Sequence, residues 1–173
     1  RKISAEYFSF HTTDAEYQLL EKIRHIPKTK FLAGNADFAL GIVTGNNKKY
    51  ISSVKNKDNE VILKGSDICK YHTNPNSNYI VFNPQNFQQV APIEMYRAPE
   101  KLLYRFISSQ LVFAYDDKQT LSLNSCNVVI PKLEGLHIKY ILAILNSRIA
   151  QFIYKMEFHS VKVLRSHIEN IPI

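Results

Sequence analysis

The stretch from Lys101 to Ile130, KLLYRFISSQLVFAYDDKQTLSLNSCNVVI, decides the fold class. It contains four runs rich in leucine, aromatic and β-branched side chains, a composition typical of strands; these runs are 101–107, 111–115, 120–123 and 127–130. The polar residues 108–110 join the first two runs. Because neighbouring short strands with short connections pair in antiparallel fashion, the stretch predicts an antiparallel meander.

Helical patterns flank this β region. Upstream, residues 13–16 (TDAE) fit a capping box, and apolar residues follow at helical spacing until Pro27. Downstream of Pro131, apolar side chains recur at helical spacing from Ile138 to Ile153 and predict one long helix that is packed on two sides. The predicted fold class is therefore α/β in the α+β sense: mainly antiparallel β-strands, an N-terminal connector helix and a packed C-terminal helix.

A second β region precedes the deciding stretch. Phe38, Leu40 and Ile42 alternate with small residues, TGNN at 44–47 has turn chemistry, and strand-like residues return over 48–53. This pattern predicts a hairpin. We expect residues 1–30 to form an N-terminal connector helix region and residues 31–173 to form the main domain.

Composition limits the functional class. The 173 residues are 45% hydrophobic, enough for one globular core, and 22 basic against 15 acidic residues give a net charge of +7. Such a charge favours a polyanionic partner, and nucleic acid is the first to consider. Two cysteines cannot form a disulfide scaffold, so we expect a cytoplasmic protein. Because the chain opens on Arg1 and Lys2 without a signal-type apolar run, we expect it to be a piece of a longer polypeptide.

Motifs for catalysis, metals and nucleotides are weak. Cys69 and His72 form no zinc motif, and the five glycines are too scattered for a phosphate-binding loop. Asp116 and Asp117 are adjacent, and consecutive strand residues point to opposite faces, so a solvated turn is the simpler interpretation. We therefore expect no catalytic residue and no metal site in this chain.

Polar and basic positions between the short strands suit DNA instead. Asparagine can bind an adenine edge and arginine a guanine edge with two hydrogen bonds each, while lysine and threonine commonly contact phosphates. The positions of these types, together with one tyrosine, that we predict to bind DNA are Thr44, Asn46, Asn47, Lys48, Lys49, Lys64, Tyr71 and Arg105. The alternative is a solvated polar surface without a partner.

Several stretches in order resemble the TaqI-like C-terminal specificity domain, the target recognition domain of adenine-specific restriction-modification methyltransferases, which is related to type I specificity subunits. They are GIVTGNN at 41–47, LKGSDICKY at 63–71, PEKLLYR at 99–105 continuing to AYDD at 114–117, LAILNSR at 142–148 and IENIPI at 168–173. The resemblance implies that residues 31–173 are a DNA target recognition domain, and that the helix before them is the connector.

The resemblance also implies a division of labour. In that family this domain reads double-stranded DNA, while a separate domain or subunit methylates adenine with S-adenosylmethionine, and in some enzymes a nuclease domain cuts with magnesium. NPQNF at 83–87 lacks the second proline and adjacent aromatic of a methyltransferase motif, so this chain is expected to hold no cofactor. The implied partners are DNA and the methyltransferase domain or subunit, with no membrane.

The resemblance implies that the 44–47 turn and the 64–71 segment face DNA. Within the predicted DNA-binding set, we expect Asn46, Asn47 and Arg105 to read bases and Tyr71 to pack beside the DNA backbone. We expect Thr44, Lys48, Lys49 and Lys64 to contact phosphates.

Two alternatives stay open at this point. The chain could be a docking module that joins protein subunits through its apolar helix without reading bases. It could also be an enzyme in which Asp116 and Asp117 bind a divalent ion to cut DNA.

Overall fold

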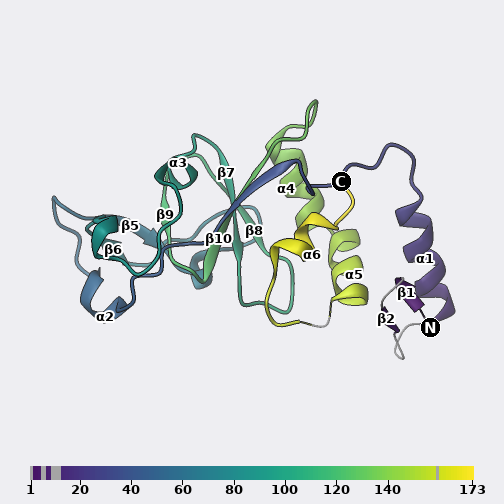
Figure 1. The fold of residues 1–173 in the computed structure, drawn as a ribbon, viewed down its shortest axis with the longest axis horizontal. Coiled ribbons are helices and arrows are strands. Elements are labelled where there is room, and N and C mark those ends of the chain that lie inside the picture. The colour runs from purple at the N-terminus through teal and green to yellow at the C-terminus, as the bar shows by residue number, and fades with distance from the viewer. Residues whose placement is uncertain (1, 5–6, 9–12, 159) are drawn as a thin grey trace.

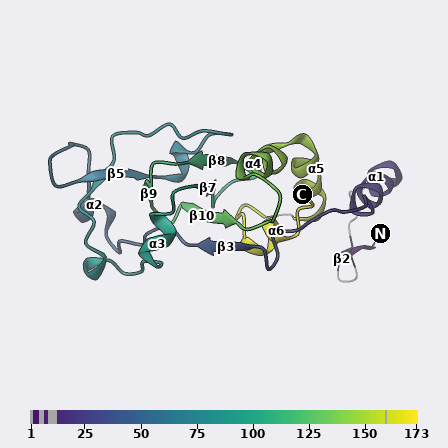
Figure 2. The same cartoon turned by 90° about the horizontal axis from the view of Figure 1, so that it is seen from above.

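A computed structural model describes residues 2–4, 7–8, 13–158 and 160–173. The predicted α+β class is confirmed, since two four-stranded sheets stand beside a group of helices. The molecule is elongated: the short helix α2 (Asn47–Tyr50) and one sheet lie at one end, the other sheet in the middle, and the C-terminal helices and α1 (Asp14–Arg24) at the other end (Figures 1 and 2).

The central sheet is antiparallel throughout, with the strand order β3-β10-β7-β8. Its strands are β3 (Ala36–Ala39), β10 (Cys126–Pro131), β7 (Lys101–Arg105) and β8 (Phe113–Asp116). The predicted pairing of β7 with β8 is confirmed, with Leu102 opposite Tyr115. The simple meander is wrong, because β10 returns beside β7 and the intervening strand leaves the sheet.

The second sheet has the order β4-β6-β5-β9 and includes one parallel pair, β5 with β9. Its strands are β4 (Ile51–Ser52), β6 (Tyr79–Ile80), β5 (Glu60–Leu63) and β9 (Leu121–Ser122). The predicted hairpin over residues 38–53 is also wrong. β3 pairs with β10 instead, and Asn47–Tyr50 forms the short helix α2, so the TGNN turn leads into a helix rather than a strand.

Short helical segments occupy the long loops between strands. They are the 3-10 helices η1 (Gly65–Asp67) and η2 (Pro84–Asn86) and the helix α3 (Ile93–Tyr96). Tyr96 on α3 is fully buried, and its hydroxyl donates to the Leu40 carbonyl at 2.7 Å and accepts from Ala91 N at 3.0 Å. The proline-rich loop is therefore anchored in the core.

The predicted C-terminal helix is two helices, α4 (Ile138–Asn146) and α5 (Arg148–Glu157), followed by α6 (Arg165–Glu169). Ser147 ends α4 in an extended conformation and caps α5, because its hydroxyl accepts from Ala150 N at 3.1 Å. A serine cap supplies the hydrogen bond that a new helix start needs. The apolar stripe runs through both helices, which is why the sequence pattern did not reveal the break.

Two apolar cores lie on the two faces of the central sheet. Because side chains alternate along a strand, Leu102 and Tyr104 of β7 pack toward α4 and α5, while Leu103 packs toward the second sheet. Lys101 and Asp116 are buried opposite each other at the start of this strand pair, and Lys101 Nζ lies 2.5 Å from Asp116 Oδ2. This ion pair joins β7 to β8 inside the protein.

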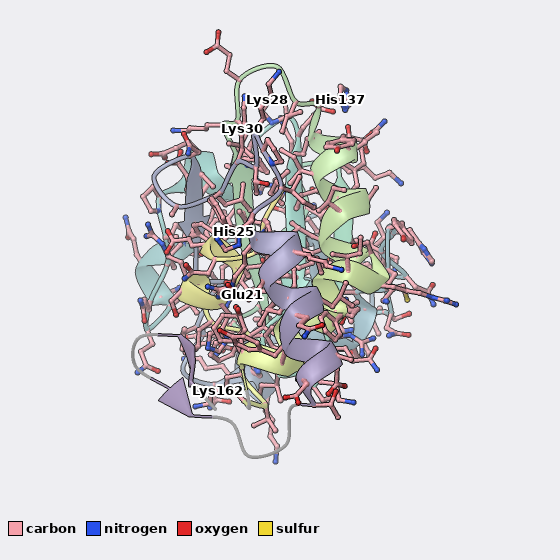
Figure 3. All side chains as sticks on the ribbon, turned by 90° about the vertical axis from the view of Figure 1, so that its right-hand side faces the viewer. Glu21, His25, Lys28, Lys30, His137 and Lys162 are labelled. Carbon is pink, nitrogen blue, oxygen red and sulfur yellow. The ribbon has the colours of Figure 1, made fainter. Side chains whose placement is uncertain are left out.

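The N-terminal helix α1 (Asp14–Arg24) has the predicted capping box, with Thr13 and Glu16 bonded reciprocally. Leu20 and Ile23 are buried in the same core as α5, and Arg24 pairs with Glu157 on α5. Figure 3 shows Glu21 and His25 along α1, and Lys28 and Lys30 in the segment that leaves it. The helix therefore packs on the rest of the chain.

The segment after α1 is also attached to the body. Lys30 Nζ donates to the Glu134 carbonyl at 2.7 Å, and the Lys30 and Ile173 backbones exchange hydrogen bonds. Strands β1 (Lys2–Ser4) and β2 (Tyr7–Phe8) pair before α1, and the rest of the predicted connector before Thr13 lies outside the described residues. No helix in the described part of the chain is both long and apolar enough to span a bilayer.

Candidate nucleic-acid interface

The turn between β9 and β10, residues 123–126, brings the predicted loops together. The Asn124 amide donates to the Ile42 carbonyl at 3.1 Å, and the Gly65 amide donates to Ser125 Oγ at 3.0 Å. Glycine is needed on both sides of the turn: a Cβ at Gly41 would lie 2.2 Å from Leu123 O, and one at Gly65 would lie 2.5 Å from Ser125 O. The turn thus lies between two loops that are far apart in sequence.

On one side of the turn, the loop after Ile42 forms a polar hollow of about 250 Å³. Thr44, Asn47, Gln88 and Asn124 supply its polar lining. Thr44 is buried, its hydroxyl donates to Asn47 Oδ1 at 2.6 Å, and it accepts from the Asn46 amide at 3.2 Å. Thr44 therefore holds the shape of the loop through its own hydrogen bonds, and its contact with a phosphate stays a prediction.

Helix α2 begins at the rim of this first hollow. Gly45 precedes it with a φ of +77°, a conformation that glycine adopts without strain. Asn46 caps the helix by accepting from the Lys49 amide at 3.2 Å. Lys48 and Lys49 are exposed, and the Lys49 ammonium lies 5.0 Å from the centre of the Tyr50 ring. Two cations therefore project from the rim.

On the other side of the turn is a second hollow of about 400 Å³. Lys64, Ser66, Arg105 and Ser125 are its polar lining, and Ile107 adds an apolar side chain that is 65% exposed. Lys64 and Arg105, predicted separately from the sequence, thus line one hollow.

The backbone around the second hollow is fixed by two side chains. Asp67 is fully buried and accepts from the Lys64 amide at 2.8 Å. Arg105 is half-buried, and its Nε donates to the Ile68 carbonyl at 3.0 Å. Because this bond uses Nε, the terminal amino groups of the guanidinium are available to a partner.

Tyr71 lines neither hollow. It lies beside β8, where its amide donates to the Phe113 carbonyl at 2.7 Å and its carbonyl accepts from the Tyr115 amide at 3.2 Å. Its φ is +77° and its side chain is 51% exposed. A bulky residue with a positive φ is uncommon, and here the two edge hydrogen bonds hold it.

Two other basic residues near the site are engaged internally. Arg97 forms two hydrogen bonds with the Glu60 carboxylate, at 2.8 and 2.6 Å, and this contact raises the pKa of Arg97 above its usual value. Lys70 Nζ lies 3.4 Å from the Asn146 carbonyl. Lys48 and Lys49, by contrast, are exposed at the rim of the first hollow.

Asp116, the first residue of the acidic pair, has a structural role. Asp116 accepts from Lys101 Nζ, from the Thr120 amide at 3.0 Å and from the Thr120 hydroxyl at 2.6 Å. Both of its oxygens are therefore occupied within the fold, which argues against the divalent-ion alternative. In the described ranges, no three His, Cys, Asp or Glu side chains gather where they could hold a metal ion.

Sequence reasoning missed Gln88, Asn124, Ser125 and Ser66 as members of this surface. Asn124 and Ser125 have the composition of a turn, which was their only signal. What places them in the site is the close approach to Gly41 and Gly65, and that contact joins segments 60 or more residues apart.

A known protein family matches a large part of this chain. The family model of the TaqI-like C-terminal specificity domain matches residues 60–173. The chain belongs to this family. The resemblance drawn from the sequence is thereby confirmed, and the second hollow of the specificity domain falls within the matched residues.

Two relatives extend the comparison. The type II methyltransferase M.VspI of Vibrio sp. (strain 343) is 40% identical over 63 residues, which are 36% of this chain and 15% of that protein. A solved chain from work on complex assembly and conformational transition of the type I R-M system has a TM-score of 0.55 and 14% identity. The match covers 91% of this specificity domain and 38% of that chain, and at this identity it shows a shared fold.

Proposed function

We propose that this specificity domain reads the base sequence of double-stranded DNA for a restriction-modification enzyme. The observation that carries the proposal is the pair of polar hollows on either side of the Asn124–Ser125 turn, with Lys48, Lys49, Lys64 and Arg105 around them. Amide and guanidinium groups in one place suit base edges, and neighbouring cations suit phosphates.

The proposed roles follow from side-chain chemistry. Asn46, Asn47 and Arg105 present side-chain groups to bases, and Asn124 and Gln88 add amides to the first hollow. Lys48, Lys49 and Lys64 contact phosphates, while Tyr71 packs beside the DNA backbone. Thr44 keeps the loop in shape through its bond to Asn47.

Catalysis belongs to the parent enzyme in this proposal. A methyltransferase domain or subunit would supply adenine methylation with S-adenosylmethionine, and a nuclease domain, where there is one, would require magnesium. Support comes from the family and from the similarity to M.VspI, of which this chain covers 15%. The parent enzyme acts on DNA in the cytoplasm.

The test is the salt dependence of DNA binding, measured by fluorescence anisotropy with a labelled duplex. Each phosphate contact contributes about 0.9 to the slope of log affinity against log salt. The variant Lys48→Ala/Lys49→Ala should therefore reduce the slope by about 2 and weaken binding at low salt. The matched control Lys22→Ala/Lys155→Ala removes two exposed lysines from α1 and α5 and should leave the slope unchanged.

Two results would contradict the proposal. If both double variants lose the same affinity, binding depends on net charge and not on this surface. If the chain binds no duplex at low salt but associates with its methyltransferase regardless of salt, it is a docking module. For that role the exposed Tyr140 and Ile149, on α4 and α5, are the first residues to vary.

A further inference from the structure

A third hollow lies on the helix side of the central sheet and has no part in the proposed contacts. Its volume is about 260 Å³, and it is bounded by β3, β7, β10 and the start of α6. Figure 1 and Figure 2 both show α6 beside the central strands. Its aromatic lining is Phe38, Tyr104 and Phe106, and its polar lining is Asn127 and Arg165.

The polar floor of this hollow is buried. Tyr104 and Asn127 are each only 4% exposed. Asn127 Oδ1 accepts from the Gly41 amide at 3.0 Å, and the Asn127 side chain also hydrogen-bonds the Tyr104 hydroxyl.

The Tyr104 hydroxyl keeps its proton. The bond from Asn127 lowers the pKa of Tyr104, as expected when the amide donates to the phenol oxygen, but burial is the larger effect and raises that pKa to about 12. The phenol is therefore neutral at physiological pH and has a proton to donate to an acceptor in the hollow.

The mouth of the hollow carries a cation over an aromatic ring. The guanidinium carbon of Arg165 lies 5.0 Å from the centre of the Phe38 ring. Arg165 Nε donates to Glu169 Oε1 at 2.8 Å, which leaves the terminal amino groups for an anion. Aromatic faces, a buried hydroxyl donor and a guanidinium are the groups with which proteins hold an unstacked base and its phosphate.

The third and second hollows are lined by alternate residues of one segment, 104–107. Tyr104 and Phe106 face it from one side of β7, while Arg105 and Ile107 line the second hollow on the other side. The Phe106 amide donates to the Ser125 carbonyl at 3.0 Å, so a residue that lines the third hollow is bonded to one that lines the second.

We propose that the third hollow binds a single unpaired nucleotide. Its base lies against Phe38 and Phe106, a ring acceptor receives the Tyr104 hydroxyl proton, and its phosphate pairs with Arg165. This inference rests on the proposed function, because a nucleotide that leaves the duplex near the second hollow is the source of the ligand. The hollow then recognises a distorted or opened site in addition to a base sequence.

The test uses adenosine and thymidine monophosphates as probes. Each is titrated into the isotope-labelled chain while the Arg165 Nε–H and Phe38 ring signals are followed by NMR. We expect saturable shifts of both signals, about tenfold weaker binding in Arg165→Gln, and weaker binding in Tyr104→Phe, which removes only the hydroxyl. Lys22→Ala/Lys155→Ala is the matched control and should bind the mononucleotides unchanged.

Duplex binding by the same samples separates the two proposals. If the chain binds duplex DNA but neither mononucleotide shifts the Arg165 and Phe38 signals, this inference is overturned and the proposed function stands. Shifts confined to Lys64 and Arg105 would overturn it equally. Saturable shifts at Arg165 and Phe38 in the wild type, together with a Phe38 shift that needs about tenfold more nucleotide in Arg165→Gln, would support the third hollow even if duplex binding failed.

Discussion

Replacing Gly41 with alanine probes the contact between Gly41 and the 123–126 turn. The proposed recognition surface, which consists of the two hollows on either side of this turn, depends on that contact. The new Cβ would lie 2.2 Å from Leu123 O and 2.5 Å from Cys126 O, both of them backbone atoms. These separations are about 1 Å or more short of ordinary van der Waals contact. The chain can relieve the overlap only by moving the 123–126 turn away from Gly41.

The cost can be worked from the contacts that would move. Overpacking with backbone displacement costs about 1–3 kcal/mol. Three hydrogen bonds are at risk, from the Gly41 amide to Asn127 Oδ1 at 3.0 Å, from Ile42 N to Ser122 O at 2.7 Å and from Asn124 N to Ile42 O at 3.1 Å. Losing one or two of them adds about 1 kcal/mol each, so we expect the free energy of unfolding to fall by about 2–5 kcal/mol.

Urea denaturation measures this loss. The chain has ten tyrosines and no tryptophan, so tyrosine fluorescence and far-ultraviolet circular dichroism are the suitable signals. Gly135→Ala is the matched control: nothing lies within 4 Å of its new Cβ, and its φ of +76° should cost only about 1 kcal/mol. Gly65→Ala, with Ser125 O at 2.5 Å, is a second variant for the case in which Gly41→Ala does not fold.

The order of the three variants decides the outcome. We expect Gly41→Ala and Gly65→Ala to lose more stability than Gly135→Ala and to weaken DNA binding beyond it as well. The reasoning fails if the free energy of unfolding of Gly41→Ala lies within about 1 kcal/mol of the wild-type value, because overpacking against the turn should cost more. The turn would then not be held against Gly41.

Three further perturbations address separate parts of the structure. Asn146→Ala should cost about 2–4 kcal/mol in urea denaturation, because the Asn146 side chain is the partner of the buried Phe113 amide at 3.0 Å; a loss below 1 kcal/mol would contradict this role. Burial lowers the pKa of His167 below its usual 6.5, so the unfolded chain takes up a proton first, and stability should fall as the pH drops below 6.5. His167→Phe should flatten that part of the stability profile, and an unchanged profile would exclude His167 as its cause. Arg105→Lys should keep the salt slope but weaken binding to the preferred sequence about tenfold, measured by anisotropy, because lysine lacks the fork that binds guanine; equal loss on all sequences would instead indicate a phosphate contact.

Local signals in the sequence predicted local structure well. The capping box at Thr13 and Glu16 predicted α1, and the two strand-like runs at 101–107 and 111–115 predicted the β7–β8 pair. The hairpin over 38–53 failed because Phe38 pairs with Val129, 91 positions along the chain by the residue numbers (129 − 38), and no short-range pattern reports such a pairing. The prediction of one long C-terminal helix failed for the opposite reason. The short-range apolar pattern continues on both sides of the Ser147 cap and so hides the break.

The recognition surface was predictable in its residue types but not in its arrangement. Lys64 and Arg105 were selected for their chemistry, and the structure brings them to one hollow. Burial separated Thr44 from the exposed Lys48 and Lys49, a distinction that residue type cannot make. Asn124 and Ser125 entered the surface only through the fold, because glycines distant in sequence permit their approach.

Selection from a pool of random duplex DNA tests the central claim most directly. The chain is incubated with the pool at two salt concentrations, and the retained duplexes are sequenced. The account predicts one enriched motif, which weakens or changes in Arg105→Lys and survives in Lys22→Ala/Lys155→Ala. Retention without any enriched motif, or no retention at low salt, would contradict sequence reading by this surface.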